Sequence, residues 1–295
     1  MLQRFLHPDI LHSIDGLDLV AKTVVDGFVA GLHRSPDFGF SQEFAEYRTY
    51  VPGDDLRQVD WNVYARTERI YLKKYRGETN SVLTILLDAS NSMQYGSHSV
   101  NKMDYARYLA ASLFYLALHN QRDAAGLITF DDEVRDFVRP STRQGQLHRL
   151  LAGLNNAEPH SRTNFVKPMH HFQDLLNRRG IVLIVSDFWE SPESIVRTIE
   201  PLRYRGNEVV LFHVLDPEDV RPKMNGPAIL VDLETDQQME VTPDYSKHDY
   251  RSKVDAHLAD LRSRAQAAGM SYCLLITDRP LDEALREYLT LRGRN

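Results

Sequence analysis

An apolar stretch followed at once by regularly spaced polar residues constrains this chain most. Val82 to Leu87 is a nearly unbroken run of branched apolar side chains, and it has the length of one strand. Such a run is typical of a strand buried on both faces of a parallel sheet. Asp88, Ser90 and Ser92 follow directly. We therefore expect a central strand with polar side chains at its carboxyl end, where open α/β sheets bind ligands.

Alternating strand and helix patterns fill the chain after this stretch. Further apolar runs of strand length occur at Ala124 to Phe130, Gly180 to Asp187, Val209 to Val214 and Ser271 to Ile276. The segments between them have mostly helical periodicity. This alternation predicts an α/β domain, at residues 80–295, whose doubly wound, mostly parallel sheet is covered on both faces.

The first 79 residues have a different pattern, which predicts a helical and β segment packed on that core. Pro8 to Leu32 carries apolar residues at helical spacing, as two amphipathic helices do. Phe44 to Tyr50 and Ile70 to Tyr75 alternate like strands. A hairpin pattern, Ile229 to Val241, lies in an insertion at about 216–249. Because strand edges need partners, we expect this hairpin to join the N-terminal strands in a small accessory sheet.

Charge and composition exclude several classes of protein. The 295 residues carry a formal net charge of -6, so no general positive field attracts nucleic acid or an anionic membrane. No apolar run approaches the roughly 18 residues of a membrane span, and the N-terminus lacks a signal-peptide core. One cysteine, Cys273, allows no intramolecular disulfide. We expect a soluble, cytoplasmic protein.

Two predicted strand ends and one loop supply candidate metal ligands. Asp88, Ser90 and Ser92 place a carboxylate and two hydroxyls on alternate residues, and Asp187 ends a second apolar run. Thr163, in a polar loop, offers a third hydroxyl. Hard oxygen ligands of this kind suit Mg²⁺, Mn²⁺ or Ca²⁺. The alternative for the first three residues is a turn or a helix cap, which Asp and Ser also favour.

These five residues resemble the metal-ion-dependent adhesion site of von Willebrand factor A domains, over a core from about Ser81 to Arg292. The resemblance implies a Rossmann-type α/β fold in which the hydroxyls hold the ion directly or through water. It implies that the two carboxylates act largely through water. It also implies an open position on the ion, which an acidic side chain of a protein partner fills.

A second resemblance lies in the segment before this core. Glu46 to Trp61, with the sequence EYRTYVPGDDLRQVDW, and the following Ala65 and Arg66 are similar to the signature of the domain of unknown function 58 family. Such proteins commonly accompany AAA+ ATPases of the MoxR type, which implies a role in the assembly or maturation of protein complexes. The chain departs from the family at 161–162, where it has Ser-Arg and the family often has two glycines.

Charged residues of this signature allow two interpretations. They form either a partner-contact surface or a network of ion pairs that pins the N-terminal segment to the core. In the second case Trp61 packs beneath them. The residues concerned are Asp54, Asp55, Arg57, Asp60 and Arg66.

A run of three acids, Asp131 to Glu133, joins two predicted strands. A second metal site is one interpretation of such a cluster. A solvated hairpin tip is the commoner one, because a short charge run usually faces water.

Two functions from different classes fit these residues. The first is a non-enzymatic, metal-dependent adaptor or co-chaperone that binds a partner's acidic side chain and works with an AAA+ ATPase. The alternative is a Mg²⁺-dependent phosphohydrolase with Asp88 as nucleophile. Haloacid-dehalogenase enzymes need an Asp where this chain has Ser90, and no lysine partner is identifiable. P-loop, dinucleotide-binding, zinc-protease and serine-hydrolase motifs are absent. We expect a binding protein, with few cations beside Asp88 and Asp187.

Overall fold

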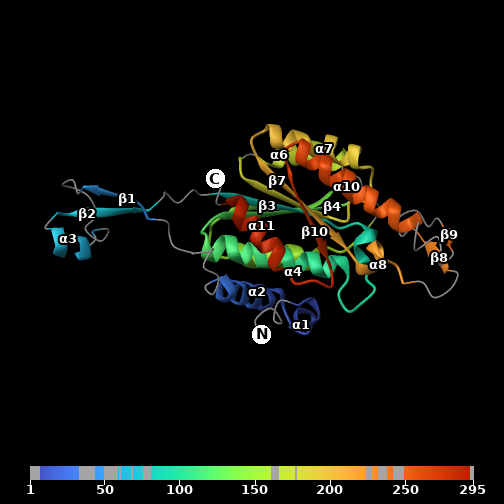
Figure 1. The fold of residues 1–295 in the computed structure, drawn as a ribbon, viewed down its shortest axis with the longest axis horizontal. Coiled ribbons are helices and arrows are strands. Elements are labelled where there is room, and N and C mark those ends of the chain that lie inside the picture. The colour runs from blue at the N-terminus through green and yellow to red at the C-terminus, as the bar shows by residue number, and fades with distance from the viewer. Residues whose placement is uncertain are drawn as a thin grey trace. The chain divides into compact units, whose positions relative to one another are not determined.

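Two compact units make up the chain, and Figure 1 labels their elements. The smaller is Val29–Asn80, and the larger combines Met1–Phe28 with Ser81–Asn295. The computed structural model describes residues 7–32, 44–49, 59, 61–67, 69–75, 81–160, 166–176, 178–223, 228–231, 238–241 and 249–292.

A six-stranded sheet forms the centre of the larger unit. Its order is β10 (Ser271–Ile276), β7 (Glu208–Leu215), β6 (Ile181–Ser186), β3 (Val82–Asp88), β4 (Ala124–Phe130) and β5 (Val134–Ser141). All neighbours are parallel except β4 and β5. The strand order reverses between β3 and β6, which are neighbours although two strands separate them in the chain. Ligand sites of open α/β sheets lie at such a switch point, beyond the carboxyl ends of the strands.

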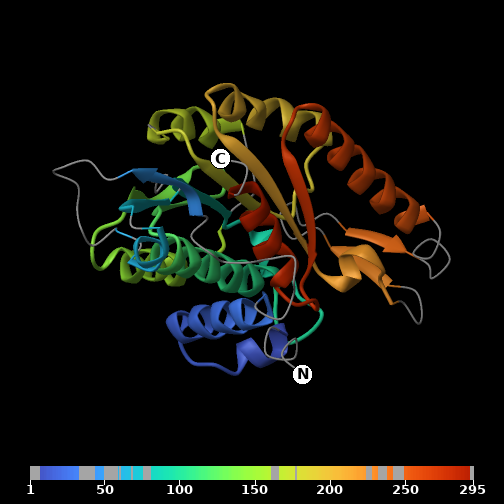
Figure 2. The ribbon, with the colours of Figure 1, turned by 60° about the vertical axis from the view of Figure 1, so that its left-hand side comes forward.

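Helices cover both faces of this sheet. α4 (Lys102–Tyr115) and α11 (Asp282–Arg292) lie on one face, and α6 (Val166–Leu175), α7 (Pro192–Tyr204) and α10 (Arg251–Ala267) lie on the other (Figure 1, Figure 2). α5 (Gln146–Asn156) packs beside α4. Every residue of β3 and β6 is buried, as the apolar runs predict. The doubly wound, mostly parallel α/β sheet is therefore confirmed.

The apolar face under α6 and α7 contains a core cluster of buried side chains. Phe130 of β4 and Phe172 of α6 meet edge to face, with ring centroids 5.2 Å apart. Ile184 of β6 and Leu211 of β7 belong to the same cluster. This packing fixes α6 over the strands β6, β3 and β4, whose carboxyl ends carry the candidate site.

The predicted N-terminal helices are present as α1 (Pro8–His12) and α2 (Leu17–Leu32). His12 Nδ1 lies 3.1 Å from the Tyr108 hydroxyl of α4. The Arg286 guanidinium of α11 lies 5.8 Å from the centroid of the Phe28 ring. These contacts attach α1 and the first part of α2 to the larger unit.

Two further pairs of strands lie outside the six-stranded sheet. β1 (Phe44–Thr49) pairs with β2 (Tyr71–Tyr75), and β8 (Ala228–Val231) pairs with β9 (Gln238–Val241), both antiparallel. Among the described strands these are separate two-stranded sheets, so the predicted union in one accessory sheet is wrong. Each strand pairs with a neighbour in the chain, because closing a short loop costs less entropy than closing a long one. A short helix, α3 (Trp61–Thr67), was not predicted.

The first testable prediction concerns the β3–β6 junction. A Cβ at Gly180 would lie 2.1 Å from the Val82 carbonyl oxygen, so the backbone of one strand must shift. We expect Gly180→Ala to lower the free energy of unfolding by about 1–3 kcal/mol, as overpacking does. Chemical denaturation measures this change.

The matched control is Gly153→Ala on α5. Its nearest contact is Leu127 Cδ2 at 3.0 Å, the end of a flexible side chain. Alanine also favours the helix by about 1 kcal/mol. Gly153→Ala should therefore be at least as stable as wild type. Equal losses in the two variants would contradict the proposed backbone clash.

Candidate functional site

Asp88 lies at the centre of the candidate site, at the carboxyl end of β3. Its side chain is buried, and both carboxylate oxygens accept hydrogen bonds. The Ser90 backbone N–H donates to Oδ1 at 2.9 Å, and Ser186 Oγ donates to Oδ2 at 2.5 Å. Because Ser186 ends β6, this bond joins the two strands at the switch point. Asp88 is therefore held in one orientation from both sides.

Two hydroxyls follow Asp88 on the loop that enters the 3₁₀ turn η3 (Asn91–Gln94). Ser90 Oγ and Ser92 Oγ lie 3.0 Å apart. Ser90 occupies the N-cap position of η3, but its side chain makes no capping hydrogen bond. Asp88 does stabilise a turn, through Ser90 N–H. The turn interpretation thus applies to Asp88, whereas the cap interpretation does not explain the hydroxyl of Ser90.

Asp187 follows β6 and is also buried. The next residue, Phe188, has a φ of 45°, in the left-handed region that bulky residues rarely adopt. Its N–H donates to Ser186 Oγ at 3.1 Å, and its carbonyl oxygen lies 2.9 Å from His257 Nε2 of α10. This strained turn is held at both peptide groups and places Asp187 beside α4.

A lysine that the sequence analysis missed stands in the site. Lys102 Nζ lies 2.7 Å from Asp187 Oδ2 and 3.2 Å from Asp219 Oδ2, and the side chain is only 2% exposed. The expectation of few cations beside Asp88 and Asp187 is therefore wrong. Lys102 begins α4, a position where the helix dipole disfavours a positive charge. That unfavourable placement is the signal that could have indicated nearby carboxylates.

A further pair of acids comes from α8 (Pro217–Val220) and the residue before it. Asp216 accepts hydrogen bonds from Ser97 N–H and Glu218 N–H, both at 2.8 Å. Asp219 accepts from Asp216 N–H at 2.9 Å, which completes a capping box. The box fixes the Asp219 carboxylate beside Lys102. Sequence reasoning missed Asp216, Asp219 and Ser186, because their proximity depends on the strand order.

The electrostatics follow from this burial. Burial, and after it the charge of Asp187, together raise the pKa of Asp88 to about 7, although hydrogen bonds from Ser186 and Ser90 act in the opposite direction. Burial disfavours the Lys102 ammonium, but the charges of Asp187 and Asp219 outweigh it and raise its pKa above the usual value. Asp88 is thus partly protonated near neutral pH. A second positive charge at the site would lower its pKa.

Several predicted residues lie outside the described residues: Thr163, Asp54, Asp55, Arg57 and Asp60. Arg66 is described, and it is exposed on α3 in the smaller unit. Trp61 of the same helix is 57% exposed and meets Tyr64 edge to face, with ring centroids 6.0 Å apart. Trp61 is therefore exposed in the smaller unit, whereas the ion-pair interpretation has it packed beneath charged residues, four of which lie outside the described residues.

The oxygens at Asp88 are compatible with a divalent cation. No group of three or more His, Cys, Asp or Glu side chains in the described ranges is arranged to hold a metal, so a site here needs hydroxyl ligands. An octahedral Mg²⁺ with bonds of about 2.1 Å places neighbouring ligands about 3 Å apart. Ser90 Oγ and Ser92 Oγ have this separation, at 3.0 Å. Lys102 already neutralises part of the negative charge at Asp187.

Comparison with protein families gives a match over most of the chain. The family described as "Protein of unknown function DUF58" matches residues 46–264. The chain belongs to this family. The matched range includes the signature that begins at Glu46 and the whole candidate site of this DUF58 protein.

Individual relatives of this DUF58 protein are themselves uncharacterised. "Uncharacterized protein Mb1516" of Mycobacterium bovis is 28% identical over 278 residues, which are 92% of this chain and 86% of the relative. Among solved structures, "conserved hypothetical protein BatB" of Bacteroides thetaiotaomicron aligns with 73% of this chain and 100% of its own, at 13% identity and a TM-score of 0.48. The "SpRpn10 VWA domain" aligns with 70% and 94%, at 10% identity and a TM-score of 0.44.

The second testable prediction concerns the buried ion pair. Lys102→Met leaves the buried carboxylates of Asp187 and Asp219 without their cation. We expect a loss of about 3–5 kcal/mol in the free energy of unfolding at pH 7, as for other broken buried pairs. Lys102→Met combined with Asp187→Asn and Asp219→Asn should recover part of this loss, because no unpaired charge is left. A Lys102→Met protein as stable as wild type would show that the pair contributes nothing.

The third prediction is a pH dependence. The folded-state pKa of Asp88, about 7, lies above the unfolded value of about 3.9. The folded state therefore keeps a proton that the unfolded state releases, and stability from this group is lost as pH rises from about 4 to 7. Without metal, the Tm of wild type should fall more between pH 5 and pH 8 than that of Asp88→Asn. Calorimetric curves that run parallel for the two proteins would refute the raised pKa.

Proposed function

We propose that this protein is a non-enzymatic, metal-dependent binding module, an adaptor or co-chaperone for a protein partner. The arrangement of Asp88, Ser90 and Ser92 at the switch point carries the proposal, because it gathers hard oxygen ligands at the ligand-binding edge of the sheet. Asp88, Ser90, Ser92, Thr163 and Asp187 would hold Mg²⁺, or Mn²⁺ or Ca²⁺. The bound ion would take an acidic side chain of the partner at its open position.

Aromatic surface near the ion supports a protein partner. Trp189 lies two residues beyond Asp187 and is 40% exposed. Its ring stacks on His257, with centroids 5.5 Å apart and planes 30° apart. Partly exposed tryptophans that are held in place are common energetic centres of protein interfaces. A carboxylate on the ion and an apolar contact at Trp189 would together define the interface.

Membership of the DUF58 family supports a particular class of partner. We propose an AAA+ ATPase of the MoxR type, with a role in the assembly or maturation of protein complexes. The exposed α3 residues Trp61, Tyr64 and Arg66 form a second candidate contact, because Trp, Tyr and Arg are the side chains most enriched at interface centres. No helix in the described ranges is long and apolar enough to cross a lipid bilayer.

The phosphohydrolase alternative gains one observation from the structure, namely a lysine in the site. Lys102 is nevertheless buried and ion-paired with both Asp187 and Asp219. Both oxygens of Asp88 already accept hydrogen bonds, and a pKa of about 7 reduces its ionised fraction. These features favour binding over nucleophilic attack.

The fourth prediction tests the metal site. Ser90→Ala with Ser92→Ala should abolish Mg²⁺ binding in calorimetry and remove the rise in Tm that Mg²⁺ gives by mass action. The metal-free Tm should change little. Ser97→Ala with Ser99→Ala is the control, since these two exposed serines have the same spacing. Equal Mg²⁺ affinity in wild type and in the Ser90, Ser92 variant would contradict the proposed metal site.

Wild type and an Asp88→Ala variant decide between adaptor and enzyme. In a pull-down, wild type should lose its partner on chelation, and Asp88→Ala should fail to retain it in Mg²⁺. Neither protein should hydrolyse an aryl phosphate. Turnover by wild type that is lost in Asp88→Ala would replace the adaptor with the hydrolase.

A further inference from the structure

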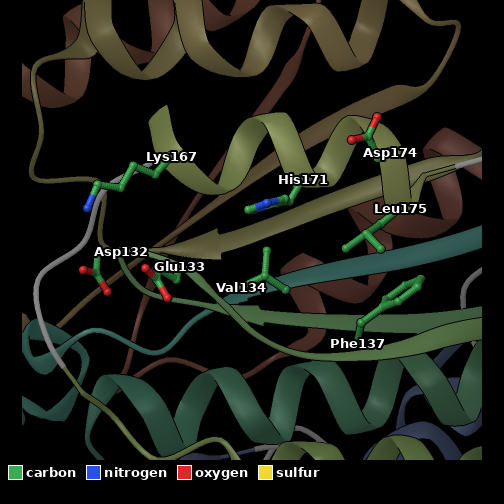
Figure 3. A pocket seen from close by; sticks show the side chains of 8 residues that line it. All are labelled: Asp132, Glu133, Val134, Phe137, Lys167, His171, Asp174 and Leu175. Atoms are coloured by element: carbon green, nitrogen blue, oxygen red, sulfur yellow. The ribbon is translucent and has the colours of Figure 1, made fainter.

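A groove of about 770 Å³ lies between the edge strand β5 and α6 (Figure 3). Its floor is apolar and its rim is charged. The floor is formed by Val134, Phe137 and Leu175, and the rim by Asp132, Glu133, Lys167, His171 and Asp174. The floor residues are half-buried and pack against the core cluster under α6. The groove thus exposes the outer margin of the hydrophobic core.

A β-bulge gives the groove its apolar floor. Phe130 of β4 opposes Val134, whereas the preceding Thr129 opposes Asp136, so Arg135 is an extra residue in β5. Side chains normally alternate along a strand, and one extra residue reverses the alternation. Val134 and Phe137, three residues apart, therefore face the same side, toward α6. The bulge thus turns both side chains toward the groove.

Ion pairs hold the acidic turn at one end of the groove. Asp131 is buried, and its carboxylate accepts hydrogen bonds from Arg135 Nε at 2.7 and 2.8 Å. Arg135 also pairs with Asp132, at 3.1 Å. The solvated-tip prediction is therefore wrong for Asp131, because this carboxylate anchors the turn. Arg135 thus pairs with two of the three acids, Asp131 and Asp132.

The rim carries more negative than positive charge. Three of its residues are acids and one is a lysine, and Arg135 of the acidic turn pairs with Asp132, so the remaining rim acids are Glu133 and Asp174. Glu133 and Asp174 are exposed and lie toward opposite ends of the groove in Figure 3. A segment lying across the floor would thus meet a carboxylate at each end. Charge complementarity points to a basic occupant.

We propose that the groove binds a segment of a partner protein in which a bulky apolar side chain is flanked by lysine or arginine. The apolar side chain fills the space over Val134, Phe137 and Leu175, and the basic side chains meet Glu133 and Asp174. The assignment rests on the proposed role as a binding module, and it adds the chemistry of the partner segment. This contact does not require the metal.

Two other occupants fit the structure less well. Small-molecule sites usually hold a few buried, convergent polar groups, whereas the polar side chains here lie on the rim. Addition of a strand to β5 is opposed by Arg135, Asp136, Arg139 and Pro140, the residue types that protect sheet edges. The N–H of Phe137 is also occupied, since it donates to the Asp136 carboxylate at 2.8 Å. The remaining way to bind is for a partner protein to insert an apolar side chain into the groove.

The groove lies close to the candidate metal site along the sheet. Phe130, directly before the acidic turn, pairs with Asp88 in the parallel register of β3 and β4. Its carbonyl oxygen accepts a hydrogen bond from Ala89 N–H at 2.7 Å. One partner could therefore place an acidic side chain on the ion and a basic, apolar segment in the groove.

The test uses two fluorescein-labelled peptides, Lys-Leu-Lys-Phe-Lys and Glu-Leu-Glu-Phe-Glu, and fluorescence anisotropy with the full chain. The basic peptide should bind, and the acidic peptide should bind at least about tenfold more weakly. Replacing two rim carboxylates, with Glu133→Gln and Asp174→Asn, should weaken the affinity for the basic peptide about fivefold. This is the combined effect expected from the loss of two exposed charge pairs. Both residues are exposed, so the fold should be kept.

The matched control is Asp255→Asn with Asp260→Asn, which removes two exposed acids from α10. It changes the net charge equally and should leave the affinity unchanged. Equal weakening in the two variants, or equal binding of the two peptides, would overturn the proposal. Binding should persist in Ser90→Ala with Ser92→Ala. Loss of Mg²⁺ binding alone in that variant supports the metal site independently, so the two proposals can fail separately.

Discussion

The ion pair between Lys102 and Asp187 is the interaction on which the candidate site depends. A charge buried at the end of a parallel sheet is costly unless an opposite charge meets it with good geometry. Here the ammonium comes from α4, one carboxylate from the residue after β6, and another from Asp219 of α8. Three elements that are distant in the chain must therefore converge before any of them can be buried.

This arrangement differs from a site that holds a metal with acids alone. Lys102 pairs with Oδ2 of Asp187, so Asp88 would supply most of the negative charge for the proposed cation, beside the Ser90 and Ser92 hydroxyls. The pKa of Asp88 is about 7, and ligand carboxylates must be ionised to bind a metal. A proton and the proposed cation would therefore compete for one carboxylate in the physiological pH range. Affinity for the ion should rise with pH for that reason.

Most of the fold could be predicted because each residue of an apolar run such as Val82 to Leu87 indicates a buried position. The alternation of strands and helices then restricts the topology to a parallel, doubly wound sheet. The partners of Lys102 could not be predicted, because they lie 85 and 117 positions away in the sequence. The prediction of a shared accessory sheet was wrong for a related reason. A strand pattern shows that a strand needs a partner, but it does not show which strand is that partner.

Two features at the carboxyl edge of the sheet have opposite preferences. The candidate ion would attract an acidic side chain, whereas the groove beside β5 carries an excess of acids and favours a basic one. A partner that presents both signs, at the spacing between Asp88 and Glu133, would gain from each contact. A partner with only acidic residues would be repelled at the rim. Opposed charges at the two neighbouring sites would therefore repel the wrong partners as well as attract the right one. A metal site alone would not repel acidic partners in this way.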